Sequence, residues 1–131
     1  MDTRTKILTA DAARRIAGQV VVAAGGSACP TIATGYFDVL RAEHVRELSE
    51  LRESGALLVV VLPLEGELLD QRSRAELVAA LRMVDYVVAA EHGDAEALIE
   101  ALKPVRVARM EAGDARRVRE LIDHVQRRQR L

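Results

Sequence analysis

Aromatic residues are almost missing from this chain of 131 residues: they make up 2% of it, and there is no tryptophan. Hydrophobic residues nevertheless account for 50% of the chain, so its core must be built from small and branched aliphatic side chains. Aliphatic cores of this kind are typical of helices packed on a sheet of β-branched strands. The length predicts one compact domain over residues 1–131.

The chain has one cysteine, Cys29, which excludes an intramolecular disulfide and a cysteine-based metal cluster. No metal site is expected, because the three histidines are scattered along the sequence. Acidic and basic residues nearly cancel to a net charge of −1, which argues against a nucleic-acid-binding surface. No run approaches the ~18 apolar residues of a membrane span, and the first residues lack the apolar stretch of a signal peptide. We therefore expect a cytoplasmic protein without nucleic-acid or membrane partners.

Short apolar runs and helical periodicity alternate along the chain. Apolar runs typical of strands buried on both faces occupy residues 20–24, 31–34, 57–62, 84–89 and 105–108. Apolar residues at helical spacing cover residues 9–17, 42–54, 74–83, 95–102 and 114–128. Strands that alternate with helices over short connections form parallel sheets with right-handed crossovers. The predicted fold is an α/β fold, three-layered and Rossmann-like, with a parallel sheet flanked by helices.

Two of the predicted helices carry expectations about individual side chains. In the helix over residues 74–83, we expect Leu77, Val78 and Leu81 to be buried together with Val84. The last predicted helix places its apolar residues on one side, and its end is rich in arginine. Interleaved acidic residues favour a solvated amphipathic helix there over a patch for nucleic acid or an anionic partner. The apolar side consists of Val118, Leu121, Ile122 and Val125.

Function is expected in the loops at one edge of the sheet, because parallel sheets bind ligands beyond the carboxyl ends of their strands. Those loops follow Ala24, Thr34, Leu62, Ala89 and Ala108. The stretch Gly25-Gly26-Ser27 is interpreted as a plain turn rather than an anion-binding loop, since no P-loop lysine follows it. Cys29 is interpreted as a small buried or loop residue rather than a nucleophile, because no histidine lies near it in sequence.

Residues 35–45 read Gly-Tyr-Phe-Asp-Val-Leu-Arg-Ala-Glu-His-Val. This stretch resembles the signature of the cytidylyltransferase-like nucleotidyltransferases. It is most similar to the heptose 1-phosphate adenylyltransferase (ADP-heptose synthase) domain, which reads Gly-x-Phe-Asp-x-Leu-His-x-Gly-His. A second stretch, residues 74–88, is similar to the family segment that runs from an arginine into a Val-Asp-x-Val-Val strand. The two stretches occur in the family's order, and the resemblance covers residues 31–109.

The resemblance implies transfer of a nucleotide from ATP or CTP, with Mg²⁺, to a sugar phosphate, with release of pyrophosphate. Catalysis of that kind depends on positioning the reactants and neutralising developing phosphate charge. By the same resemblance, Arg41 and His44 take the catalytic positions at the start of a helix, where they would contact phosphates. The candidate nucleotide-binding residues are Thr34, Gly35, Phe37, Asp38, Arg74 and Arg109.

The signature departs from the family pattern at positions that carry its chemistry. Arg41 replaces the first histidine and Glu43 replaces the glycine, so that only His44 remains. A carboxylate ~5 Å from a phosphate charge costs roughly 3 kcal/mol at an effective dielectric near ~20. The chain also has no lysine between Lys6 and Lys103 and no Ser or Thr after position 73, so the family's lysine and Ser/Thr phosphate-binding turns are absent.

We interpret the chain as a nucleotidyltransferase-like domain with a degraded active site, binding a small-molecule nucleotide or sugar phosphate at most. The alternative is an active nucleotidyltransferase that joins a nucleoside monophosphate to a sugar phosphate. His44 would then be a phosphate contact, and otherwise it would face solvent in the first turn of its helix. A non-catalytic domain would serve as a homodimer or as a subunit docked to another protein.

Overall fold

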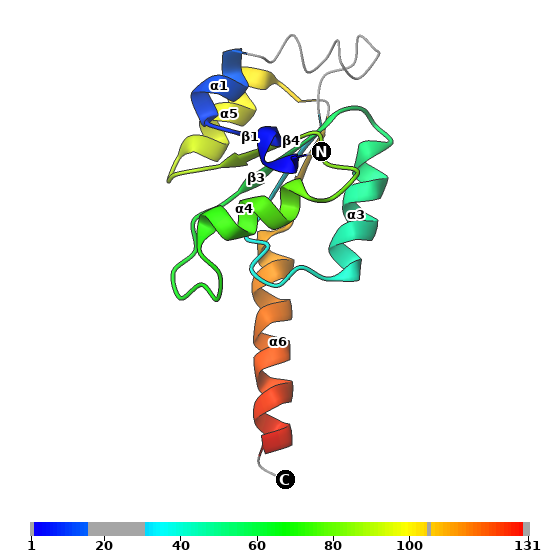
Figure 1. The fold of residues 1–131 in the computed structure, drawn as a ribbon, viewed down its shortest axis with the longest axis vertical. Helices are drawn as coiled ribbons and strands as arrows, with labels where there is room; N and C mark the ends of the chain where they lie inside the picture. Colours follow the sequence, from blue (N-terminus) through cyan, green and yellow to red (C-terminus); the bar gives the residue numbers. More distant parts are fainter. Residues whose placement is uncertain (1, 16–30, 105, 130–131) are drawn as a thin grey trace.

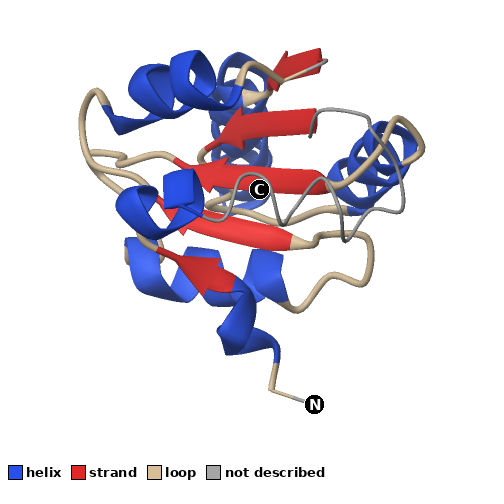
Figure 2. Ribbon diagram, turned by 90° about the horizontal axis from the view of Figure 1, so that it is seen from above, coloured by secondary structure: helices blue, strands red, loops and turns tan. Residues whose placement is uncertain are grey.

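The computed structural model describes residues 2–15, 31–104 and 106–129. Its sheet has the strand order β1-β4-β3-β2-β5, and neighbouring strands are parallel throughout. The strands are β1 (Ile7–Leu8), β2 (Thr31–Gly35), β3 (Leu57–Val61), β4 (Tyr86–Ala89) and β5 (Arg106–Arg109). The helices are η1 (Thr3–Lys6), α1 (Ala10–Arg15), α3 (Ala42–Arg52), α4 (Gln71–Ala79), α5 (Asp94–Leu102) and α6 (Glu111–Gln129). Helices flank the parallel sheet (Figure 2), which confirms the predicted Rossmann-like α/β fold.

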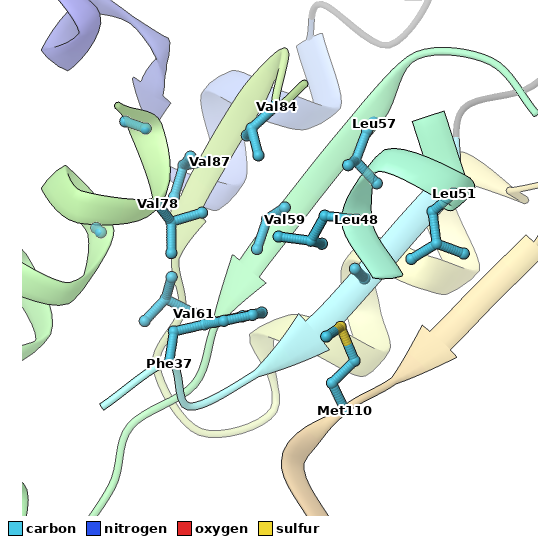
Figure 3. Close-up of a cluster of buried hydrophobic side chains, with 13 residues drawn as sticks. Phe37, Leu48, Leu51, Leu57, Val59, Val61, Val78, Val84, Val87 and Met110 are labelled. Carbon is cyan, nitrogen blue, oxygen red and sulfur yellow. The ribbon is translucent and has the colours of Figure 1, made fainter. Parts of the chain in front are cut away.

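The central strand β3 is buried on both faces and divides the core in two. Successive strand residues point to opposite faces, so Val59 packs among the residues of α3 and α4 while Val60 packs among those of α1 and α5. Figure 3 shows the first cluster, in which Phe37 and Leu48 converge on β3. Continuous apolar strands such as β3 are the pattern that a doubly covered parallel sheet requires.

The order of the strands places a topological switch point between β2 and β5. From β2 the chain moves to β3 and then to β4, and it returns to β5 on the other side of β2. Thr34 pairs with Arg109 across this junction. The carboxyl ends of two strands on either side of such a reversal form the crevice in which parallel sheets bind ligands.

α6 begins directly after β5 and extends away from the rest of the molecule (Figure 1). Residues 119–129 of this helix are all exposed. Among the helices of the described ranges, none has both the length and the apolar character needed to cross a bilayer.

Most predicted elements coincide with observed ones, with shifted ends. The predicted strands at residues 31–34 and 57–62 are β2 and β3, whereas β4 begins at Tyr86 rather than at residue 84. β5 begins at Arg106, and α1 is described through Arg15. The predicted strand at residues 20–24, the turn at 25–27 and Cys29 lie outside the described residues. The short elements η1 and β1 were not predicted.

The prediction for α4 was wrong at both ends and in one exposed residue, since the helix ends at Ala79 rather than at residue 83, and Leu81 is only partly buried. The helix begins at Gln71 instead of residue 74, because the Asp70 carboxylate caps it by accepting the Ser73 N–H at 2.7 Å. Leu77 is 44% exposed, since the helix turns Ala75 and Val78 toward the sheet instead. α6 likewise begins at Glu111, three residues before the predicted start.

Candidate functional site

The turn after β2 brings several of the predicted site residues to the switch point. Thr34 and Gly35 end the strand, and Phe37 follows with a φ of 52°. A left-handed backbone is uncommon for a bulky residue and marks a tightly constrained turn. The turn directs Phe37 into the core, where its ring centroid lies 5.7 Å from that of His44. Phe37 therefore supports the site from beneath, packed against the first turn of α3.

Asp38 holds the loop that follows β3. This loop of residues 62–70 is here called the β3–α4 loop. The Asp38 side chain is 4% exposed. Its carboxylate accepts the N–H of Leu68 at 2.8 and 3.0 Å and the N–H of Leu69 at 2.9 Å. Backbone donors thus satisfy the buried charge, and its nucleotide-binding role stays a prediction.

Arg74 is fully buried and bonded within the protein. Its Nη1 donates to the carbonyl oxygens of Tyr36 and Leu62, each at 2.8 Å. Its Nε donates to the Leu69 carbonyl at 3.1 Å, and its Nη2 donates to the Glu67 carboxylate at 2.7 Å. A guanidinium has five N–H donors, so most of them are used here to join the loops after β2 and β3. A phosphate contact from this residue would have to displace those bonds.

His44 and Arg41 meet at the first turn of α3. The backbone N–H of Arg41, the N-cap residue, donates to His44 Nδ1 at 3.0 Å. Because Nδ1 accepts, we assign the proton of the neutral ring to Nε2. His44 is 1% exposed, so the solvent-facing alternative was wrong. Arg41 is exposed and Glu43 is half-buried, so the two altered signature residues lie in the same turn as the retained His44.

A carboxylate that the sequence reasoning did not single out lies at the switch point itself. The hydroxyl of Thr34, which is fully buried, donates to the carboxylate of Glu111 at 2.8 Å. Glu111 is the first residue of α6, where a negative charge is favoured by the helix dipole. The backbone N–H of Met110 donates to the Thr34 carbonyl at 2.7 Å and fixes this junction. The only sequence signal was the position of Glu111, in the loop that follows the last predicted strand.

Arg109, at the end of β5, points its charge to α5. Its Nη1 and Nη2 donate to the two carboxylate oxygens of Glu96 at 2.6 and 3.2 Å. This pairing lowers the pKa of Glu96, chiefly through the hydrogen bond from Arg109, and raises the pKa of Arg109 for the same reason. Both side chains are exposed, so the pair is screened by solvent. Arg109 therefore pairs with α5, whereas Arg41 lies at the start of α3.

Two hollows lie along the carboxyl ends of the strands. One, of about 280 Å³, is formed by loops after β2, β3 and β4, and it carries the carboxylates of Glu91 and Glu96 together with His92. The other, of about 420 Å³, lies beside β1 and β4 and includes Arg72. Neither set of lining residues contains Arg41 or His44. Within the described ranges, no group of three or more His, Cys, Asp or Glu could hold a metal ion.

No family model matches the chain. Among curated proteins, it is 42% identical over 80 residues to the bifunctional protein HldE of Pelobacter propionicus, which covers 53% of this chain and 16% of that protein. It is also 32% identical over 84 residues to the FAD synthase of Ferroglobus placidus, covering 59% of this chain and 55% of the relative. The chain therefore spans a small part of the first relative and about half of the second.

A solved structure supports the same fold. The crystal structure of a lipopolysaccharide core biosynthesis protein from Thermoplasma volcanium matches with a TM-score of 0.56 and 29% sequence identity. The match covers 60% of this chain and 71% of the other. The structural neighbour thus agrees with the observed fold over that part of the chain.

Proposed function

Because the chain is related to the cytidylyltransferase-like nucleotidyltransferases, we propose that it is a member whose active site has degraded. In this proposal the domain binds a nucleotide weakly at most and transfers it slowly or not at all. We place it in the cytoplasm, in line with the sequence-based expectation.

The contact between Thr34 and Glu111 carries the proposal. In this contact the Glu111 carboxylate accepts the hydroxyl of Thr34, near the end of β2, at the switch point between β2 and β5. An anionic phosphate entering this crevice would meet that charge and the charge of Glu43 in the first turn of α3. Each carboxylate within ~5 Å of a phosphate costs roughly 3 kcal/mol at an effective dielectric near ~20. Together they oppose the binding that phosphoryl transfer requires.

Two of the three candidate arginines that would offset this repulsion, Arg74 and Arg109, are engaged elsewhere. Arg74 is buried and bonded to three carbonyl oxygens and to Glu67. Arg109 forms a two-oxygen pair with Glu96. The neighbouring hollow of about 280 Å³ carries two carboxylates and no lysine or arginine among its lining residues. This distribution of charge supports a site that has lost its affinity for phosphate.

A residual site would take ATP or CTP through the first turn of α3. There the exposed Arg41 and the positive end of the helix dipole favour an anion. Mg²⁺ would enter with the nucleotide, because magnesium in such sites is held largely by substrate phosphates and water. The residues that would meet it are carboxylates, and these fit a hydrated cation better than they fit a bare phosphate.

The experiment is isothermal titration of ATP and CTP, each with Mg²⁺, into the wild type, two single variants and the double variant that combines them. Glu43→Gly removes one carboxylate, and Glu111→Gln removes the second charge while keeping an acceptor for the Thr34 hydroxyl. We expect weak or undetectable binding by the wild type and tighter binding by the double variant, by about tenfold or more. Leu77→Gln, an exposed change on α4, is the matched control and should bind as the wild type does. Micromolar binding by the wild type, unchanged in both variants, would contradict the proposal.

An active nucleotidyltransferase is the second candidate, and the meeting of Arg41 and His44 in one turn favours it. It is tested by following pyrophosphate release from ATP or CTP in the presence of sugar 1-phosphates. Release by the wild type that Arg41→Ala abolishes would establish turnover and replace the first proposal. No release, with nucleotide binding recovered in the double variant, would support the degraded site.

A further inference from the structure

The exposed part of α6 lacks the packing that normally stabilises a helix. Residues 119–129 are all exposed, and the helix stands off from the rest of the molecule (Figure 1). Leu121, Ile122 and Val125 lie on one stripe of it and are 38%, 40% and 46% exposed. Short isolated helices are marginal in water, and most helices in proteins are held by packing of an apolar face. Contact with a partner surface would therefore stabilise this part of the helix.

A second exposed apolar patch lies at the same edge of the molecule. The β3–α4 loop leaves the carboxyl end of β3, as α6 leaves the carboxyl end of β5, and in a parallel sheet these ends share one edge. Leu68 and Leu69 in this loop are 61% and 37% exposed. They are held outward because Asp38 and Arg74 bind the backbone of the loop.

The charges of the β3–α4 loop and of the last turn of α6 are opposite, whereas Glu120 and Asp123 lie earlier on the exposed part of the helix. The β3–α4 loop carries exposed acidic residues at positions 65, 67 and 70, and no basic residue. The last turn of α6 carries Arg127 and Arg128, with Arg119 two turns earlier. Such an arrangement favours contact between the end of α6 and this loop. Within one molecule, the end of α6 points away from the body, so the complementary surface must come from another chain.

We propose that two copies of this chain pair through antiparallel α6 helices, and that the end of each helix rests on the β3–α4 loop of the other copy. Leu121, Ile122 and Val125 then meet their counterparts around a twofold axis, as an isologous interface requires. The exposed segment is about 15 Å long at 1.5 Å per residue. Its last turn therefore reaches the base of the partner's exposed segment, beside the partner's loop. This pairing does not depend on the proposed function.

The size of the surface sets the expected strength of the dimer. A standard stable interface uses about 20–30 residues on each side. Residues 119–129 and 65–70 together are fewer than this. We therefore expect a reversible dimer with a dissociation constant in the micromolar range. The partner helix would lie next to Asp38 and Arg74, and dimerisation would restrain the loop that these residues hold.

The test is sedimentation equilibrium of the full chain, with variants of both patches. Ile122→Glu should weaken the dimer by about tenfold or more, because it places a charge on the twofold stripe. Leu77→Glu is the matched control, since Leu77 is equally exposed but lies on α4, and this variant should dimerise as the wild type does. Circular dichroism of each variant checks that helix content is retained.

A charge swap identifies the contact. Arg128→Glu alone should weaken association, and combining it with Glu65→Arg should restore it in part. In a Cys29→Ser background, a mixture of Leu68→Cys and Arg128→Cys chains should form a disulfide between unlike copies.

The proposal is overturned by a monomer up to a chain concentration of about 0.5 mM. It is equally overturned by a dimer that survives Ile122→Glu and gives no cross-link, because another surface would then be used.

Discussion

Asp38 and Arg74 bind the two backbone polar groups of Leu69. The Asp38 carboxylate accepts the Leu69 N–H at 2.9 Å, and Arg74 Nε donates to the Leu69 carbonyl oxygen at 3.1 Å. Both side chains are buried, and the arginine also bonds to the loop after β2. Two residues that the sequence assigns to nucleotide binding thus fix the shape of the β3–α4 loop.

Replacing the arginine by lysine should destabilise the protein strongly. In Arg74→Lys, a single ammonium cannot reach the acceptors that the guanidinium fork reaches in three directions, so buried carbonyl oxygens lose their donors. We expect a loss of about 2–4 kcal/mol in the free energy of unfolding. Urea denaturation measures it. Arg72→Lys, an exposed change one residue from the same helix start, should stay within about 0.5 kcal/mol of the wild type; equal losses in both variants would show that the buried network contributes nothing special.

Gln71 makes a second link at the carboxyl ends of the strands. Its Nε2 donates to the carbonyl oxygens of Val61 at 2.9 Å and Ala90 at 2.6 Å, at the ends of β3 and β4. In Gln71→Glu, a carboxylate would face two carbonyl oxygens without a proton to donate. We expect a loss of about 2–3 kcal/mol at neutral pH, measured by urea denaturation.

The same variant should become less impaired as the pH falls. The carbonyl oxygens and the partial burial would raise the pKa of the new carboxyl in the folded state. A raised folded-state pKa means that the folded protein binds more protons, so the deficit relative to wild type shrinks as the pH drops through that pKa. Gln71→Ala serves as the control, because its deficit should not change with pH. A constant deficit in both variants would rule out the proposed contacts.

The strands and the signature helix could be predicted from the sequence, because their information is local. Continuous apolar runs such as the one that becomes β3 specify a strand buried on both faces. β1 was missed because two residues, Ile7 and Leu8, are too short a run to carry a pattern. The start of α4 was missed although Asp70 and Ser73 form a local capping signal, since the apolar pattern alone was followed.

The roles of the site residues depend on contacts between distant parts of the chain. Thr34 and Glu111 are 77 positions apart, and Arg74 reaches Tyr36 across 38. Contacts over such separations produce no spacing or periodicity in the sequence. The resemblance to the family therefore identified the candidate site residues but not their hydrogen-bond partners. His44 shows the same limit: its position in the motif was known, while its burial follows from packing against Phe37.

Acid should weaken the start of α4. The pKa of Asp70 is lowered, chiefly by the backbone hydrogen bond from Ser73. A lowered folded-state pKa gives stability that is present above the pKa of an unfolded aspartate, about 3.9. That stability is lost as the pH falls through the folded value. Asp70→Asn keeps a capping oxygen without a titrating charge. Its melting temperature should therefore fall less than that of the wild type between pH 5 and about pH 3; a parallel fall in both would remove Asp70 from the acid response.

The end of α5 offers a stabilising substitution. Lys103 caps the helix with a φ of 46° and a ψ of 61°, and its N–H donates to the Ile99 carbonyl at 3.0 Å. A left-handed conformation strains a residue with a Cβ, whereas glycine adopts it freely. Lys103→Gly should raise the free energy of unfolding by about 0.5–1 kcal/mol, after the greater backbone entropy that glycine has in the unfolded chain is subtracted. Glu100→Gly, inside the same helix, should instead lower it by about 1 kcal/mol. Thermal or urea unfolding of the two variants tests this prediction. Changes of opposite sign in the free energy of unfolding would reflect the left-handed backbone at residue 103. Equal losses in both variants would show that this conformation is not populated.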